Sequence, residues 1–392
     1  MGQITKREYK LADGRDLIYF DDADTTLPPE REPDLREPAD RPPTPTMRQD
    51  VLTGDWISIA ATRQNRVFLP PTEHDPLSPA SPSNPSEIPS NYDVAVFENK
   101  SPSFGPAISA ASEPESGDDL ARIGLGRTHT SVGRCEVVSF SPQHEGSFGS
   151  LTVSRARTVI EAWADRTAVL SSLPNIREVF PFENRGEAIG VTLHHPHGQI
   201  YAYPYVTPRT SNLIRSIENY GPTLFQDLLE SERESTRVIL SGDHWTAFVP
   251  FAARWPIEVH LLPHRHIPDF AGTSDAERDE LSVLYLRLLR GIDALYETPT
   301  PYIAAWHQAP VEEHRSDIRL MLQLTSPRRA ADKLKYLAGS EAAMGAWIGD
   351  ILPEQAAEAI REAVARADIL RPITSLSPVA PRSSAELGEA TV

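Results

Sequence analysis

The chain has 392 residues, 40% of them hydrophobic and 24% charged, which is enough apolar material for a sizeable core and excludes a wholly disordered chain. The 38 Lys and Arg against 55 Asp and Glu give a formal net charge of −17. This balance disfavours sequence-independent binding to nucleic acid or to an anionic membrane surface, because both need an excess of basic residues. The single cysteine, Cys135, excludes an intrachain disulfide and favours a reducing compartment. No apolar run approaches 18 residues and the first 20 residues lack a secretion signal, so we expect a soluble cytoplasmic protein without a membrane span.

The first half of the chain alternates proline-rich stretches with regular elements. We expect residues 1–45 to form an acidic, proline-rich N-terminal extension, and the stretch 70–89 to form a surface loop. Hydrophobic patterning predicts strands at 55–61, 92–97 and 135–140, a helix at 152–173, and a hairpin made of 179–182 and 188–191.

The second half of the chain shows a similar succession of predicted strands and helices. Strands are predicted at 245–250, 258–263 and 318–324, and helices at 274–296 and 353–367, the first of them opened by a Ser274–Glu277 capping box. We therefore predict an α+β fold in which two related units share a mixed or antiparallel sheet flanked by helices. The units are expected to span 46–205 and 206–371, followed by a loose tail at 372–392.

The motif most indicative of chemistry is His195-Pro196-His197-Gly198-Gln199. Proline fixes φ, and glycine lets the backbone approach a ligand closely. Strand-like alternation would point both histidines to one side, followed by the glutamine. An imidazole with a neutral amide two residues away suits attack on phosphorus, because the ring displaces a leaving oxygen while the amide stabilises charge on a non-bridging oxygen. The plainer interpretation is a surface loop that exposes two histidines.

This motif and the Phe-Glu-Asn-Arg-Gly segment at 182–186 resemble the galactose-1-phosphate uridylyltransferase family of the histidine-triad superfamily. Further matching pieces occur in the family's order at residues 48–57, 96–99, 139–144, 249–256, 305–310 and 335–341. The resemblance implies an enzyme of galactose metabolism that moves UMP from UDP-glucose to galactose 1-phosphate through a covalent uridylyl-histidine. It also implies a homodimer.

The resemblance further implies a role for each matching residue. His197 would be the nucleophile, and Gln199 would contact the transferred phosphoryl group. Histidine-triad hydrolases carry a third histidine where this chain has Gln199; a neutral amide cannot act as a base for water, so the covalent intermediate survives to meet a sugar phosphate. The residues implied to bind substrate are Asn184, Gly190 and Thr192 at the phosphates, Arg63, Arg66 and Asn99 at the nucleotide, and Lys335, Tyr336, Ser340 and Glu341 at the hexose.

The sequence departs from the family at its metal sites. Of the implied structural zinc ligands, His144 and His195 persist, but serine stands at both cysteine positions, 78 and 81. Serine hydroxyls are poor zinc ligands, so we expect weak zinc binding, or a metal-free protein, unless His74 or Asp75 is recruited.

A second site, which holds iron in some members, retains His307 but has Met321 and Gln323 in place of histidines. Iron binding is therefore not expected.

Two other functions remain open at this point. One is a related nucleotidyltransferase or phosphorylase acting on another nucleotide sugar, such as an ADP-sugar; those enzymes tend to have serine where this chain has Gly198. The other is a non-catalytic nucleotide-sugar-binding protein. The intact motif at 195–199 argues against the second function.

Overall fold

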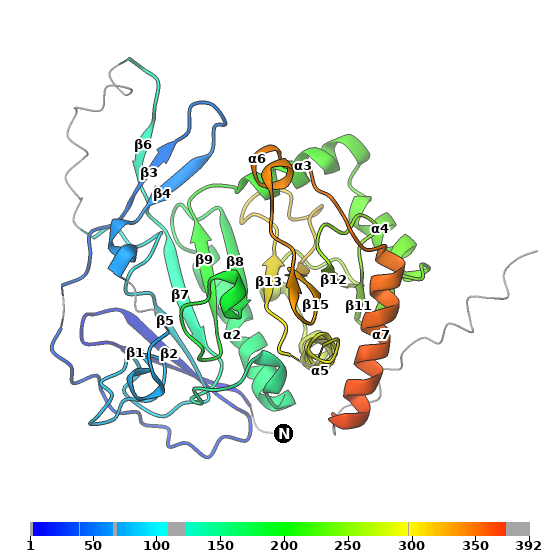
Figure 1. Ribbon diagram of the computed structural model, residues 1–392. Coiled ribbons are helices and arrows are strands. Elements are labelled where there is room, and N and C mark those ends of the chain that lie inside the picture. The colour runs from blue at the N-terminus through cyan, green and yellow to red at the C-terminus, as the bar shows by residue number, and fades with distance from the viewer. Residues whose placement is uncertain (1–2, 39, 66–68, 109–122, 297, 374–392) are drawn as a thin grey trace, which may run out of the picture.

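The computed structural model describes residues 3–38, 40–65, 69–108, 123–296 and 298–373. An 11-stranded sheet forms the centre, and each pair of neighbouring strands runs antiparallel (Figure 1). The predicted α+β class is thereby confirmed. In spatial order the strands are β1 (Thr5–Lys10), β2 (Asp16–Asp21), β5 (Val94–Glu98), β7 (Arg134–Ser139), β9 (His197–Tyr203), β8 (Glu178–Arg185), β13 (Tyr302–His307), β14 (Met321–Ser326), β12 (Ile257–Pro263), β11 (Trp245–Phe248) and β10 (Val238–Ser241).

Three long helices cover one face of this sheet. They are α2 (Val153–Ser171), α5 (Asp275–Asp293) and α7 (Pro353–Leu370), and their apolar sides join the strands in the main hydrophobic core. The predicted capping box is confirmed, since Ser274 and Glu277 exchange hydrogen bonds at the start of α5. None of the helices in the described ranges is long and apolar enough to cross a membrane.

The opposite face of the sheet is covered only towards its two ends. At one end, α3 (Pro208–Tyr220) and α4 (Leu224–Arg233), two helices that we did not predict, pack on β11, β12 and β14 through a separate apolar cluster. At the other end, residues 75–92 pack on β2 and β5. No helix of the described residues covers the middle strands β9, β8 and β13 on this face.

Two smaller sheets rise from this open face. The first, here called the arm, consists of β4 (Trp56–Ile59), β3 (Thr46–Gln49) and β6 (Thr128–Thr130), and it projects from the body at the upper left of Figure 1. The second pairs β15 (Arg328–Ala330) with β16 (Lys333–Leu334) and is followed by α6 (Gly339–Met344).

The two halves of the main sheet share one topology and meet where β8 pairs with β13. The order β5-β7-β9-β8 with α2 in the first half matches the order β11-β12-β14-β13 with α5 in the second. The strand register shows which residues of the two halves are equivalent. Phe182 pairs with both Gln199 and Ala305, and Ala305 pairs with Gln323. Gln323 thus occupies the position of Gln199, and Met321 that of His197, so the second half has no histidine at the nucleophile's position.

Three predictions along the chain need correction. The hairpin of 179–182 and 188–191 was wrong, because β8 runs on to Arg185 and pairs with β9, which begins only at His197. Residues 70–89 do more than form a surface loop, since Leu77 and Ile88 are fully buried. Finally, β1 and β2 extend the main sheet from within residues 1–45, where we predicted no strand.

Glu183 in β8 generates a prediction about pH. Its side chain is buried, one carboxyl oxygen accepts a hydrogen bond from the Tyr302 hydroxyl at 3.0 Å, and the other has no partner in the described part of the chain. Burial raises the pKa of Glu183 to about 8, against the opposing charge of Arg185. Between about pH 4.3 and pH 8 the folded protein therefore holds a proton that the unfolded chain has released, so stability falls as pH rises.

Glu183→Gln, an isosteric mimic of the protonated acid, should abolish this loss. We expect the free energy of unfolding of the wild type to fall relative to the variant by roughly 3–5 kcal/mol between pH 5 and pH 9, levelling off above pH 8. Urea unfolding of both proteins across this range measures the difference. A wild-type-minus-variant difference that stays constant with pH would contradict a protonated Glu183.

Candidate active site

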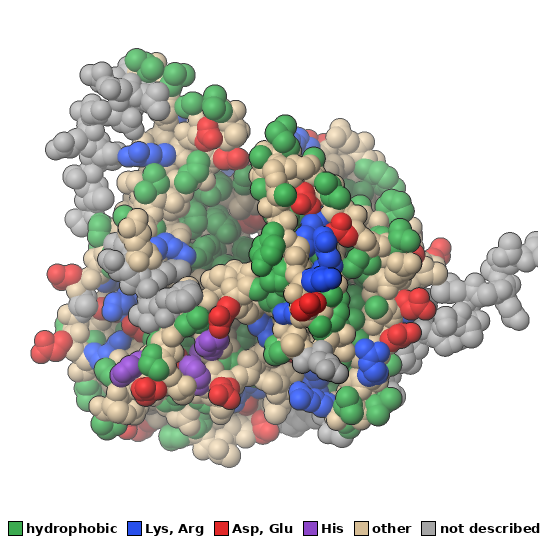
Figure 2. All heavy atoms as spheres, viewed as in Figure 1, with side chains coloured by type: hydrophobic (Ala, Val, Ile, Leu, Met, Phe, Trp, Pro, Cys, Tyr) green, Lys and Arg blue, Asp and Glu red, His purple; other side chains and the backbone are tan. Residues whose placement is uncertain are grey.

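The open middle of the sheet forms a hollow with an aromatic floor. Along β9, His197, Gln199 and the tyrosines that follow are half-buried, while the alternate residues are fully buried, so the former share the helix-free face. In Figure 2 the hollow appears between the arm and α6, with hydrophobic side chains at its base. The rings that contact one another in this floor belong to Phe104, Phe180, Phe182, Tyr201, Tyr203 and Tyr205.

His197 stands at the start of β9 with one ring nitrogen fixed. Its Nδ1–H donates to the backbone carbonyl of His195 at 2.7 Å, which leaves the lone pair on Nε2. Burial lowers the pKa of His197 below its ordinary value, partly offset by that hydrogen bond. The ring is therefore neutral near pH 7 and able to act as a nucleophile.

Gln199 and Asn184 lie beside this ring on adjacent strands. The Oε1 atom of Gln199 is buried and has no hydrogen-bond partner among the described residues, as expected of a group that meets a ligand. Asn184 alternates with the buried Glu183, so it faces the hollow with Phe182 and Gln199.

The loop before the motif is shaped by its backbone. Gly190 has φ of +83°, in the left-handed region that favours glycine. Two residues later, the carbonyl of Thr192 accepts a hydrogen bond from the backbone of Leu69 at 2.9 Å. Both residues therefore lie in the segment that leads into the motif, as the resemblance implies.

His195 is fully buried and held on both ring nitrogens. Its Nδ1 lies 2.6 Å from Oδ2 of Asp75, and its Nε2 lies 2.6 Å from the backbone carbonyl of Ser141. The hydroxyls of Ser139 and Tyr92 lie 3.0 and 3.2 Å from Nε2. The carbonyl that fixes the His197 ring is therefore part of a residue whose side chain is itself fixed.

Asp75 also joins His144 to this group. Nδ1 of His144 lies 2.8 Å from the same Oδ2, and the Ser78 hydroxyl donates to it at 2.6 Å. Although burial opposes ionisation, hydrogen bonds from His195 and Ser78 hold the pKa of Asp75 well below its ordinary range. The side chains of Asp75, His144 and His195 thus bring three potential metal ligands within 4.8 Å of one another.

This donor set fits a divalent metal. Two imidazole nitrogens and one carboxylate are established zinc ligands, and His195 would still donate its other ring N–H to a backbone carbonyl, as metal-bound histidines commonly do. The sequence analysis named Asp75 only as an alternative to the missing cysteines. The hydroxyl of Ser81, at the second cysteine position, instead contacts Ser83 and the backbone of Asn84.

Two of the residues implied at the nucleotide, Arg63 and Asn99, lie in the described part of the chain. Arg63, in the short helix η1 (Ala61–Asn65), donates to the Ser103 hydroxyl at 2.8 Å and reaches the Tyr201 hydroxyl at 3.4 Å. Asn99 follows β5 and accepts a hydrogen bond from the backbone of Ser101. Arg66 lies outside the described residues.

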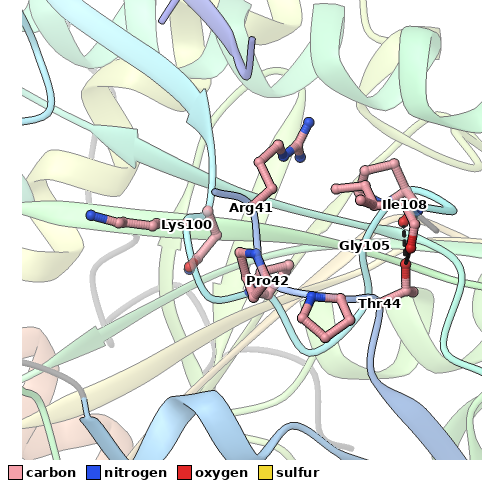
Figure 3. Close-up of a pocket in the computed structure, with 10 residues that line it drawn as sticks. Arg41, Pro42, Thr44, Lys100, Gly105 and Ile108 are labelled. Carbon is pink, nitrogen blue, oxygen red and sulfur yellow. Dashed lines mark hydrogen bonds between the residues drawn. The ribbon is translucent and has the colours of Figure 1, made fainter. Parts of the chain in front are cut away.

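Asn99 lines a narrow cavity together with Arg41 and Lys100. Figure 3 shows the charged ends of these two side chains pointing in different directions, and Thr44 hydrogen-bonded to Ile108 across the cavity. The cavity therefore does not gather the two cations around one anion.

The residues implied at the hexose occupy the segment around α6. Lys335 and Glu341 form an ion pair of 2.8 Å with both side chains buried, and the Ser340 hydroxyl donates to the carbonyl of Ala346. Tyr336 is 76% exposed, and it borders a cavity of about 180 Å³ whose other wall includes Ile189. Tyr336 thus lies close to the loop that contains Gly190, which the resemblance implies at the phosphates. Lys335 and Glu341, in contrast, pair with each other.

At the position of the implied iron site, the side chains of Glu258, Gln323 and His307 follow one another in a chain of polar contacts. Gln323 donates to Glu258 at 2.6 Å and lies 3.4 Å from Nε2 of His307, whose ring packs on Phe180. Burial lowers the pKa of His307 well below its ordinary value, so this ring is neutral at physiological pH. His307 is accordingly a packed residue of the sheet.

Family models match both halves of the chain. The model of the galactose-1-phosphate uridyl transferase N-terminal domain matches residues 37–207, and that of the C-terminal domain matches residues 207–370. The chain belongs to this family. Within it, the galactose-1-phosphate uridylyltransferase of Streptomyces lividans is 41% identical over 381 residues, covering 92% of this chain and 98% of the relative.

Solved structures show the same relationship. A uridylyltransferase structure superposes with a TM-score of 0.71 at 28% identity, covering 82% of this chain and 99% of that chain. An ADP-glucose phosphorylase from Arabidopsis thaliana, solved with bound ADP-glucose, has a TM-score of 0.60 at 24% identity and covers 81% and 98% of the two chains, so it shares the fold.

Tyr92, at the start of the predicted strand 92–97, has a role at the site that we did not predict. Its buried hydroxyl lies within hydrogen-bond distance of the carbonyls of Leu77 and Ser141, at 2.6 and 2.8 Å, as well as of His195. One side chain thus ties together three segments that surround Asp75. No local pattern marks such a residue, because its contacts all depend on tertiary structure.

Proposed function

We propose that this protein transfers UMP from UDP-glucose to galactose 1-phosphate through a covalent intermediate on His197. The observation that carries the proposal is a neutral, half-buried His197 whose Nδ1–H is fixed on the carbonyl of His195, which leaves the lone pair on Nε2 beside the side chain of Gln199. The Streptomyces lividans relative named galactose-1-phosphate uridylyltransferase covers 92% of the chain.

In the first step Nε2 attacks the α-phosphorus of UDP-glucose. An N–P bond forms, the P–O bond to the β-phosphate breaks, and glucose 1-phosphate leaves with that electron pair. The ring now carries positive charge, which the Nδ1–H···O=C bond to His195 stabilises. A phosphate oxygen of galactose 1-phosphate then attacks the same phosphorus and breaks the N–P bond, giving UDP-galactose and free His197.

The amides of Gln199 and Asn184 would donate hydrogen bonds to the non-bridging oxygens of the transferred group. Gly190 and Thr192 would contact the phosphates. The nucleotide would be bound by Arg63, Arg66 and Asn99. Because Gln199 is not titratable near neutral pH, it does not assist attack by water.

Gly198 favours this activity over transfer from an ADP-sugar. A Cβ on Gly198 would lie 2.8 Å from the Phe140 ring and 3.0 Å from the carbonyl of Phe182, so the serine expected of the ADP-sugar enzymes has no room without movement of Phe140. A non-catalytic binding protein would have no need for a neutral His197 with a fixed tautomer.

A homodimer in the cytoplasm forms part of the proposal. The tip of the arm exposes Leu52 and Ile57, and the segment after α6 exposes Ile348, so apolar side chains border the hollow on two sides. A second copy that covers them would bring its own Lys335–Glu341 segment towards the hexose.

We also propose a structural zinc ion at Asp75, His144 and His195. When bound, the metal would crosslink the segments that carry these residues and take no part in the transfer. Its contribution to catalysis would be to hold His195, and with it the carbonyl that orients His197.

His197→Gly tests the nucleophile. We expect transfer between sugar phosphates to fall by roughly 10⁴-fold or more, because no other group replaces the imidazole. UMP joined to free imidazole should restore formation of UDP-galactose from galactose 1-phosphate in this variant, since Asn184 and Gln199 remain. His194→Gly, which removes an exposed histidine three residues away, is the matched control and should stay active. Turnover of His197→Gly at the wild-type rate would refute the assignment.

Elemental analysis tests the metal. Protein purified without chelators should carry about one equivalent of zinc per chain, and Asp75→Ala should carry less than about a tenth. Ser81→Ala, at a former cysteine position, should match the wild type. Removal of the metal should lower the Tm of the wild type, because a ligand bound only to the folded state stabilises it. Wild-type protein with less than about a tenth of an equivalent and an unchanged Tm in EDTA would show that hydrogen bonds alone hold this cluster.

A further inference from the structure

A third cavity lies on the helix-covered side of the sheet, where α5 and α7 end. Its volume is about 600 Å³, within the range of sites for small molecules. In Figure 2, basic side chains gather beside these two helices. The polar residues that line the cavity include Ser147, Ser150, Arg185, Arg290, Asp293 and Arg371.

The lining carries an excess of positive charge. Asp293 is neutralised by Arg185 at 2.6 Å, whereas neither Arg290 nor Arg371 forms an ion pair with a carboxylate in the described ranges. Burial lowers the pKa of Arg290, and the neighbouring charge of Arg371 lowers it further, against a smaller opposing effect of Asp368. A cationic cavity is unusual in a chain of net charge −17.

Part of this charge has a structural role. Arg290 donates to the backbone carbonyls of Gly149 and Leu151, at 2.9 and 3.0 Å, and approaches the carbonyl of Arg371 at 3.4 Å. These contacts give hydrogen-bond donors to carbonyl groups at the ends of the chain segments around the cavity. The guanidinium of Arg371 is exposed and makes no hydrogen bond to the described residues. Its five donors are available to a ligand.

The cavity is separate from the candidate active site but borders the same motif. Arg185 and Asn184 are consecutive in β8 and therefore face opposite sides of the sheet, one towards each site. Gly146, which also lines the cavity, lies beside Pro196, since a Cβ there would be in ordinary van der Waals contact with the proline ring at 3.6 Å.

We propose that this cavity binds a phosphate monoester of a small metabolite, with Arg371 as its main ligand. A guanidinium group pairs with phosphate through two parallel hydrogen bonds, which Arg371 can supply, while Arg290 adds a second positive charge that no carboxylate in the described ranges pairs with. The volume leaves room for a sugar attached to the phosphate.

The test is isothermal titration calorimetry of the full chain with glucose 6-phosphate and, separately, inorganic phosphate, at constant ionic strength. Arg371→Gln should weaken binding of the sugar phosphate by at least about tenfold. Arg366→Gln is the matched control: Arg366 lies near the same end of α7, is exposed, donates to the carbonyl of Ala294 and does not line the cavity. It should bind as the wild type does.

Both variants should transfer UMP at the wild-type rate, which separates this site from the active site. Equal affinity of Arg371→Gln and the wild type for glucose 6-phosphate would overturn the proposal, as would the absence of any binding to the wild type. Binding of inorganic phosphate that is equally sensitive to Arg371→Gln would support the site and identify the phosphate group as the part recognised.

Discussion

The hydrogen bond from Nδ1 of His197 to the carbonyl of His195 is the interaction on which the rest of the site depends. It selects one tautomer, and so places the lone pair on the nitrogen that faces the hollow. A backbone carbonyl can do this only if its own residue does not move. His195 meets that condition, because one of its ring nitrogens is hydrogen-bonded to Asp75 and the other to the backbone carbonyl of Ser141.

The sheet explains why the site lies at its centre. Apolar clusters cover the open face only at its ends, beneath residues 75–92 and beneath α3 and α4. The strands between them carry half-buried aromatic side chains with the reactive group at one end of β9. The second half of the sheet has a strand in the equivalent position, but Met321 stands there in place of a histidine, so only the first half carries the candidate nucleophile.

Much of the fold could be predicted from the sequence wherever one short segment holds all the information. The capping box at Ser274, the proline that opens α7, and the strand-length apolar segments of β5, β7 and β12 are of this kind. The motif at 195–199 likewise led to the prediction that His197 is the nucleophile, because proline, glycine, the histidine and the glutamine lie within five adjacent residues.

The rest depended on contacts between distant segments. Asp75 lies in a proline-rich stretch typical of a loop, and its burial requires His195, 120 positions away. The end of β8 reads as a polar turn, yet Glu183 is buried against Tyr302, 119 positions away. In β2, Asp21 is buried because Arg7 and Arg31 pair with it, a solution that hydrophobic patterning does not reveal.

The most direct test of this account is to trap the intermediate. The protein is mixed with UDP-glucose labelled in the uridine, without an acceptor sugar phosphate, then quenched in alkali and digested, and the labelled peptide is sequenced by mass spectrometry. The account predicts one uridylyl group on Nε2 of His197 that is released as UDP-galactose when galactose 1-phosphate is added before the quench. Label on another residue, or no covalent label while transfer proceeds at full rate, would contradict it.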